Sequence, residues 1–246
     1  MLKTIDLLDL TELKMYVNGE WKAALNGETI SVTNPSTGKV VAKVPNGGRR
    51  ETKEAIAAAE QAFKTWSKLT AQERGKYLKK LHDLMHEYKD QLAEIMSLEM
   101  GKPFTEAQGE VAFAASYLEW FAEEGRRIYG ETIPASVANK RLTVIRQPIG
   151  VVASITPWNF PLAMMTRKVG PAMAAGCTAI VKPAKQSPIS AIAFGKLVEM
   201  AGVPAGVVSI VTGSAGPISD EIFENPVVRK ISFTGSTEVG KLLVTK

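Results

Sequence analysis

The chain has 246 residues, of which 45% are hydrophobic and 22% are charged, values close to the average of globular proteins. This composition excludes a disordered or collagen-like protein, and the single cysteine excludes a fold held together by disulfides within the chain. The net charge of +5 arises in residues 131–246, which favours a local anionic ligand such as a phosphate over a nucleic-acid partner with its need for clustered basic side chains.

The N-terminal segment, residues 1–14, lacks the pattern of a signal peptide. It carries acidic side chains where a signal peptide is basic and then uniformly apolar. No apolar run in the chain approaches the ~20 residues that are needed to cross a bilayer. We therefore expect a cytoplasmic protein without a membrane partner.

The first half of the chain predicts short strands followed by helices. Residues 14–21 and 29–45 alternate apolar and polar side chains around Asn-Gly and Asn-Pro-Ser-Thr-Gly turns, which is typical of small antiparallel strands. Between residues 51 and 127, apolar side chains recur every three or four positions. This period predicts a helical region, which is interrupted at Thr70 and at residues 101–103.

The second half of the chain alternates strands and helices. Runs rich in Val and Ile occupy residues 149–155, 178–182, 207–211 and 230–233, and each run precedes turn residues and a helical segment. This pattern is typical of an α/β fold with an open, doubly wound parallel sheet of the Rossmann-like type. Ligands of such sheets bind beyond the carboxyl ends of the strands, so we expect the functional residues to follow these four runs.

Three strand ends carry residues that could bind a ligand. Residues 156–161 read Thr-Pro-Trp-Asn-Phe-Pro, and Pro161 suits the first position of the next helix. Lys182 and Lys185 bracket the second turn, while residues 233–237 combine a glycine with a helix N-terminus that can bind phosphate. The G-x-G-x-x-G fingerprint is absent. A proline-rich turn with a buried tryptophan and an ordinary pair of surface lysines are the alternative interpretations.

The order of these segments resembles the aldehyde dehydrogenase superfamily. The resemblance rests on NGEW and NPSTGKVVAKVP near the N-terminus, on PWNFP and KPA after the first two strands, and on FTGSTEVG after the fourth. It extends over nearly all residues after Met15 and is strongest to succinate-semialdehyde dehydrogenases that use NADP. It implies a dinucleotide-binding domain over residues 1–130 and 149–246, and a bridging strand segment at residues 131–148 that takes part in oligomerisation.

The resemblance also implies roles for the strand-end residues. Residues 156–158 would contact the nicotinamide side of the cofactor and Lys182 the adenosine ribose. The turn at residues 235–236 would bind the pyrophosphate, with Val239 against the adenine. The carboxamide of Asn159 would donate a hydrogen bond to the substrate's carbonyl oxygen as it becomes an oxyanion. The implied cofactor-binding residues are Ile155, Thr156, Pro157, Trp158, Asn159, Lys182, Pro183, Ala184, Lys185, Gly216, Phe233, Thr234, Gly235, Ser236 and Val239.

Lys185 indicates NADP as the cofactor. In relatives that prefer NAD, this position is often a glutamate, whose carboxylate accepts hydrogen bonds from the ribose hydroxyls and repels a 2′-phosphate. A lysine has three donors and no acceptor, and a charge-assisted contact to the phosphate contributes roughly 1.5–3 kcal/mol. We therefore expect NADP to bind more tightly than NAD. The alternative is a solvated lysine that does not contact the phosphate.

Arg167 is the candidate for recognising the substrate. The resemblance implies that this arginine meets the distant carboxylate of a small-molecule semialdehyde substrate, and a planar guanidinium suits that task. An arginine two turns into a helix is otherwise an ordinary surface or interhelix charge.

Two further features imitate functional sites. His82 and His86 are spaced like the histidines of a zinc-protease helix, but Asp83 stands where the longer glutamate is needed and no third ligand is apparent. Cys177 is the single thiol, yet it precedes a buried strand and has no base near it in sequence. We expect no metal site, and we expect Cys177 to be an inert packing residue.

The resemblance also implies groups that this sequence does not contain. In the family a cysteine thiolate attacks the aldehyde, and a glutamate activates the water that hydrolyses the thioester. Both follow the segment that resembles residues 233–240. We therefore expect the chain alone to be inactive and to expose one edge of its sheet, and the complete protein to form a homo-oligomer, a dimer or a tetramer. The alternative is a nucleotide-binding module without catalysis.

Overall fold

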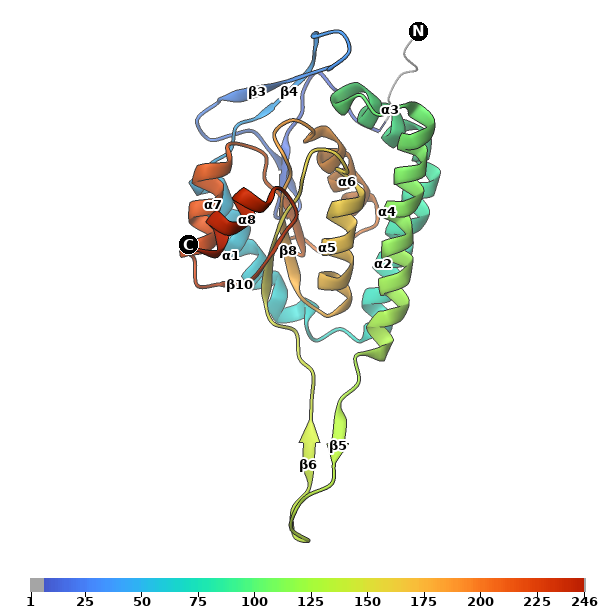
Figure 1. The fold of residues 1–246 in the computed structure, drawn as a ribbon, viewed down its shortest axis with the longest axis vertical. Coiled ribbons are helices and arrows are strands. Elements are labelled where there is room, and N and C mark those ends of the chain that lie inside the picture. The colour runs from blue at the N-terminus through green and yellow to red at the C-terminus, as the bar shows by residue number, and fades with distance from the viewer. Residues whose placement is uncertain (1–6, 246) are drawn as a thin grey trace.

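A six-stranded sheet runs through the middle of the molecule (Figure 1) in this computed structural model, which describes residues 7–245. Four of its strands are parallel, in the order β10 (Val228–Phe233), β7 (Val151–Ile155), β8 (Thr178–Lys182) and β9 (Val208–Ile210). They correspond to the four apolar runs of the sequence. The parallel sheet is therefore present as predicted, with β10 at its edge.

The remaining two strands come from the N-terminal segment, of which residues 1–6 lie outside the described part. β1 (Met15–Val17) pairs antiparallel with β9 and with β2 (Glu20–Lys22), so the main sheet is mixed. The sequence predicts these strands but not their place in the sheet. All three residues of β1 are buried, because the strand lies among other elements of the core. β3 (Thr29–Thr33) and β4 (Val40–Pro45) form a separate hairpin.

Helices cover both faces of the sheet, which makes the fold doubly wound as predicted. In Figure 1, α1 (Arg49–Trp66) and α7 (Ala215–Glu224) lie on one face, and α5 (Ala163–Ala174) and α6 (Ile189–Met200) lie on the other. The last helix, α8 (Thr237–Val244), lies near α7 and packs beside β10.

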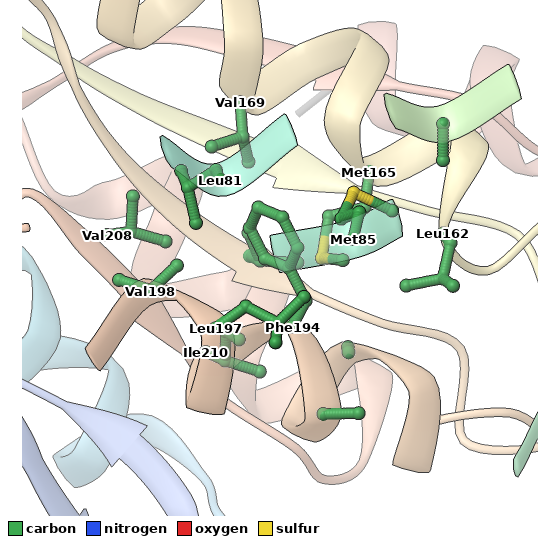
Figure 2. Close-up of a cluster of buried hydrophobic side chains, with 14 of the residues drawn as sticks. Leu81, Met85, Leu162, Met165, Val169, Phe194, Leu197, Val198, Val208 and Ile210 are labelled. Carbon is green, nitrogen blue, oxygen red and sulfur yellow. The ribbon is translucent and has the colours of Figure 1, made fainter. Parts of the chain in front are cut away.

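An outer helical layer covers α5 and α6. It consists of α2 (Ala71–Glu87), α3 (Lys89–Met100) and α4 (Phe104–Glu124), followed by a single 3₁₀ turn, Gly125–Arg127. Figure 2 shows the core between this layer and the sheet, with Phe194 in its middle. The labelled side chains come from α2, the α5 region, α6 and β9: Leu81, Met85, Leu162, Met165, Val169, Phe194, Leu197, Val198, Val208 and Ile210.

The interruptions of the helical region have local causes. The hydroxyl of Thr70 accepts a hydrogen bond from the amide of Glu73 and caps α2. Gly101 ends α3 in the left-handed conformation, with φ at +78°. Both breaks were predicted. A third break at Tyr88, between α2 and α3, was not predicted, because no glycine or proline marks it.

A two-stranded arm projects from the body of the molecule (Figure 1). β5 (Glu131–Ile133) pairs antiparallel with β6 (Leu142–Val144), and all six residues of these strands are exposed. The arm lies within residues 131–148, the segment for which the resemblance implies a part in oligomerisation. Among residues 7–245, no helix is both long enough and apolar enough to cross a membrane.

Candidate functional site

An open cavity of about 620 Å³ lies at the carboxyl ends of the parallel strands. Twelve of the fifteen predicted cofactor-binding residues line it, and Ile155, Pro183 and Gly216 do not. Gln186 and Ala215 line it without having been predicted. The lining residues are Thr156, Pro157, Trp158, Asn159, Lys182, Ala184, Lys185, Gln186, Ala215, Phe233, Thr234, Gly235, Ser236 and Val239.

The cavity exists because three neighbouring strands end at the same level. Ile155 is in register with Lys182 on one side and with Phe233 on the other. The pairing continues one residue further, since the amide of Thr156 donates to the carbonyl of Lys182 at 3.2 Å and the amide of Thr234 donates to that of Ile155 at 3.1 Å. The three loops that follow these strands are therefore held side by side.

Lys182 places a buried cation at this end of the sheet. Its exposed fraction is 5%, and burial lowers the pKa of its ammonium group to about 8, with a smaller contribution from the positive charge of Lys185. Neither lysine forms an ion pair with any residue in the described part of the chain. The buried hydroxyl of Thr156 also has no hydrogen-bond partner there. Unpaired buried polar groups suit a site that receives a polar, anionic ligand.

The turn between β10 and α8 brings backbone close to the cavity. A Cβ atom at Gly235 would clash with the Phe233 ring, so only glycine fits this turn without rearrangement. The hydroxyl of Ser236 caps α8 by accepting a hydrogen bond from the amide of Val239 at 3.3 Å. Because Ser236 and Val239 both line the cavity, the N-terminus of α8 adjoins it. Such a helix end attracts phosphate groups.

The loop after β7 presents two side chains to the cavity. Trp158 is 51% exposed, which is contrary to the interpretation of this segment as a turn around a buried tryptophan. The carbonyl of Trp158 accepts a hydrogen bond from the Ser187 hydroxyl at 2.9 Å. The side chain of Asn159 is exposed, and its carboxamide makes no hydrogen bond within residues 7–245. Its two N–H donors are therefore free to bind a ligand.

Helix α5 begins later than the sequence predicts. Pro161 is not its first residue, because the helix starts at Ala163. The amides of Leu162 and Ala163 donate to the buried carboxylate of Glu110 at 3.1 and 3.2 Å, which caps this end from another helix. At the other end, Arg74 donates to the carbonyl of Ala174 at 3.0 Å. Charged groups of the outer layer thus bind both ends of α5.

Arg167, the predicted substrate-binding residue, is exposed on α5 and does not line the cavity. The adjacent Lys168 is buried instead, and its ammonium group donates to the carbonyl of Met164 and to the hydroxyl of Thr234. Burial lowers the pKa of Lys168 to about 8, and the positive charge of Arg167 adds to this. The sequence did not single out Lys168, since only the helix orientation distinguishes it from its neighbour.

The two features that imitate functional sites lie away from the cavity. The rings of His82 and His86 are 4.6 Å apart on α2, and His82 contacts the exposed Asp83. No group of three or more metal-ligating side chains occurs among the residues that the structure describes. Cys177 is buried just before β8, at the opposite end of that strand from Lys182. A thiol in that position cannot reach a ligand in the cavity.

Comparison with known proteins relates this fold to enzymes. A model of the aldehyde dehydrogenase family matches residues 21–246. The glutarate-semialdehyde dehydrogenase of Pseudomonas putida (strain KT2440) is 58% identical over 229 residues, which are 93% of this chain and 48% of that protein. The NADP(+) succinate-semialdehyde dehydrogenase GabD of Escherichia coli (strain K12) is 58% identical over 236 residues, 96% of this chain and 49% of that protein.

Solved structures of similar proteins have the same fold. A structure described as an Escherichia coli NADP dependent enzyme superposes with a TM-score of 0.94 at 57% identity, covering 96% of this chain and 49% of that chain. The succinate-semialdehyde dehydrogenase of Burkholderia pseudomallei superposes with a TM-score of 0.94 at 52% identity, again over 96% and 49% of the two chains. The chain therefore spans about half the length of the relatives that it matches.

Proposed function

The chain belongs to the aldehyde dehydrogenase family, and from this premise we propose that it forms the cofactor-binding portion of an NADP-dependent dehydrogenase. The substrate of the complete enzyme is succinate semialdehyde or a similar semialdehyde, which it oxidises to the carboxylate. The observation that carries this proposal is the cavity in which Lys182, Lys185 and the glycine turn at residue 235 meet at one end of a parallel sheet. Two lysines and a helix N-terminus together suit a ligand with several phosphate groups.

Each part of the cavity has a proposed task in holding NADP, which accepts a hydride from the substrate when bound. Lys182 binds the adenosine ribose, and its burial at 5% exposure keeps it in place. The turn at residues 235–236 lets the pyrophosphate approach backbone amides, and Val239 packs against the adenine. Lys185 neutralises the 2′-phosphate that distinguishes NADP from NAD.

Asn159 and Arg167 are the proposed substrate-binding residues. The free carboxamide of Asn159 donates a hydrogen bond to the aldehyde oxygen as negative charge develops on it. Arg167 is proposed to meet the substrate's carboxylate, and its exposed position leaves the guanidinium available. The buried Cys177 lies at the wrong end of β8 to attack the aldehyde. We therefore propose that the nucleophilic thiol and the general base come from residues outside these 246.

The β5–β6 arm is proposed as an oligomerisation element. Its strands leave Ile133, Leu142 and Val144 between 41% and 44% exposed. A two-stranded ribbon without other support is marginally stable in water, so the arm needs a partner surface. A second copy of the chain is the proposed partner.

A binding experiment tests the cofactor assignment on this chain. Titration calorimetry should show NADP binding about 10- to 150-fold more tightly than NAD, the equivalent of roughly 1.5–3 kcal/mol for one charge-assisted contact. Lys185→Glu should remove or reverse the preference, whereas Lys39→Glu, the same change in an exposed turn, should preserve it. Equal or tighter binding of NAD by the unchanged chain would contradict the proposal.

The second candidate function is a nucleotide-binding module that acts without catalysis. The position of Cys177 favours it for the isolated chain, because no thiol reaches the cavity. The sequence of the gene distinguishes the two candidate functions. A reading frame that continues past Lys246 into a further cysteine-containing segment supports the dehydrogenase. A stop codon after Lys246, together with tight NADP binding, supports the module.

A further inference from the structure

A buried ion pair lies beside the loop that carries Asn159. Lys102 belongs to the short connection between α3 and α4, and Glu110 lies on α4. Their side chains are in direct contact and are only 9% and 1% exposed. Breaking a buried pair by removing one partner leaves the other charge without compensation, so both residues are strongly constrained.

The pair contacts both sides of the loop. The ammonium group of Lys102 donates a hydrogen bond to the backbone carbonyl of Asn159 at 3.0 Å. It also lies 3.9 Å from the centre of the Phe160 ring, within range of a cation–π interaction. The carboxylate of Glu110 accepts hydrogen bonds from the amides of Leu162 and Ala163. One ion pair thus contacts the backbone of Asn159, Leu162 and Ala163 and the ring of Phe160.

The side chain of Asn159 has no comparable support of its own. It is exposed, and its carboxamide bonds to nothing in the described part of the chain. Its direction therefore depends on its own backbone, which is held at the carbonyl by Lys102 and one residue earlier by Ser187. A carbonyl that is fixed in space fixes the peptide plane, and with it the direction in which the side chain can extend.

We propose that Lys102 and Glu110 are positioning residues, which hold the loop at residues 157–162 so that the carboxamide of Asn159 faces the cavity. Neither side chain lines the cavity, and both act from the outer helical layer through the backbone of the loop. The catalytic consequence rests on the proposed function, because it requires that Asn159 bind the aldehyde oxygen. The structural consequence, an ordered loop, does not.

Hydrogen exchange on the 246-residue chain tests the structural consequence. Lys102→Met should speed the exchange of backbone amides in residues 160–166 by about tenfold or more, since the Asn159 carbonyl loses its donor and Glu110, which binds the first turn of α5, loses its paired cation. Lys79→Met is the matched control, because Lys79 forms an exposed ion pair with Glu123 on the same helix as Glu110. It should leave these amides unchanged. Unchanged exchange in a folded Lys102→Met chain would overturn the proposal.

Two further variants keep the test decisive. Glu110→Gln keeps the shape and an acceptor oxygen but removes the charge, so it should also speed exchange in residues 160–166 if Lys102→Met fails to fold. Lys102→Arg keeps a cation that can reach the Asn159 carbonyl and should restore part of the protection. Protection that is equal in Glu110→Gln and in the unchanged chain would overturn the proposal as well.

Kinetics on the complete dehydrogenase test the catalytic consequence. Lys102→Met should lower kcat by about tenfold or more while the KM for NADP stays within about twofold, because only the oxyanion donor is misplaced. In the Asn159→Ala background, Lys102→Met should cause no further loss, because a positioning residue has nothing left to position. A further loss of kcat equal to that in the unchanged enzyme would overturn this role.

The two experiments separate this inference from the proposed function. If the complete protein oxidises no semialdehyde, the proposed function fails, while the exchange experiment still decides whether Lys102 and Glu110 hold the loop. If the enzyme is active and the exchange is unchanged, the positioning role fails and the proposed function stands.

Discussion

Two inner strands of the central sheet, β7 and β8, and the two strands of the projecting arm have opposite environments. β7 and β8 read VVASI and TAIVK, and every residue in them is buried. β5 and β6 read ETI and LTV, and every residue in them is exposed. Residues that favour strands do so in both places, but burial depends on what packs against the strand. The exposure of β5 and β6 is the difference that supports our proposal of a partner surface for the arm.

The largest expected effect is a loss of stability when a buried residue of β7 or β8 is truncated. Ile180 lies in the middle of β8 with no exposed surface. Ile180→Ala should lower the free energy of unfolding by about 2–5 kcal/mol, because it removes buried methyl groups and leaves a cavity. Val144→Ala in the arm should change it by less than about 0.5 kcal/mol. Urea unfolding of both variants measures the two changes in the free energy of unfolding. Equal changes would contradict the difference in burial between the sheet and the arm.

The second effect is on association. Leu142→Asp places a charge on the exposed arm, where we propose that a second copy binds. Burying that carboxylate in the interface should weaken association by about 2 kcal/mol, or roughly thirtyfold, while the folding of the isolated chain is preserved. Sedimentation over a range of concentrations measures the dissociation constant. An unchanged constant would show that the arm does not form the interface.

The third effect is a pH dependence of NADP binding, which the buried Lys182 at the end of the sheet should cause. The lowered pKa of Lys182, about 8, means that its ammonium group loses a proton as the pH rises above 8, whereas an ordinary lysine stays charged to about 10. NADP affinity should therefore be constant between about pH 7 and pH 8, where the 2′-phosphate is ionised, and fall by up to about tenfold per pH unit above pH 8. Calorimetry at several pH values checks this.

Lys182→Arg provides the control for that pH dependence. A guanidinium stays protonated throughout the range, so the break near pH 8 should disappear in this variant. A break that persists would assign the titration to Lys168, whose pKa burial also lowers to about 8.

The smallest effect concerns the ion pair of the arm. Arg146 and Glu131 lie 3.7 Å apart, and their side chains are 60% and 62% exposed. Glu131→Gln should change the free energy of unfolding by less than about 0.5 kcal/mol, because water screens exposed pairs. Glu110→Gln, which alters the buried pair with Lys102, should have a clearly larger effect. Thermal unfolding of the two variants side by side tests whether burial decides the difference.

Several structural features were predictable because their causes are local. Thr70 caps a helix through a residue three positions later, and Gly101 ends one by its own backbone conformation. The strands at β7 and β8 follow from continuous apolar runs. Predicting their carboxyl ends as the site was sufficient to find most residues that line the cavity, since parallel neighbours end on the same side.

Other features were not predictable because their causes are distant in the chain. Helix α5 begins at Ala163, and not at Pro161, beside a carboxylate that lies 53 residues away from Ala163 in sequence. Lys102 reaches the carbonyl of Asn159 across 57 residues. The sequence also could not tell that Lys168, and not Arg167, would be buried, because a helix orients its residues only after it packs.

Local patterns thus established the type of most elements, the parallel sheet and the edge of that sheet where the cavity lies. Only the tertiary structure decided how β1 joins the sheet, which charges are buried and which side chains hold the loop of Asn159. The physical reason is that hydrophobic periodicity and turn chemistry act between neighbours in sequence. Desolvation, ion pairing and hydrogen bonding to a loop depend instead on residues that only folding brings together.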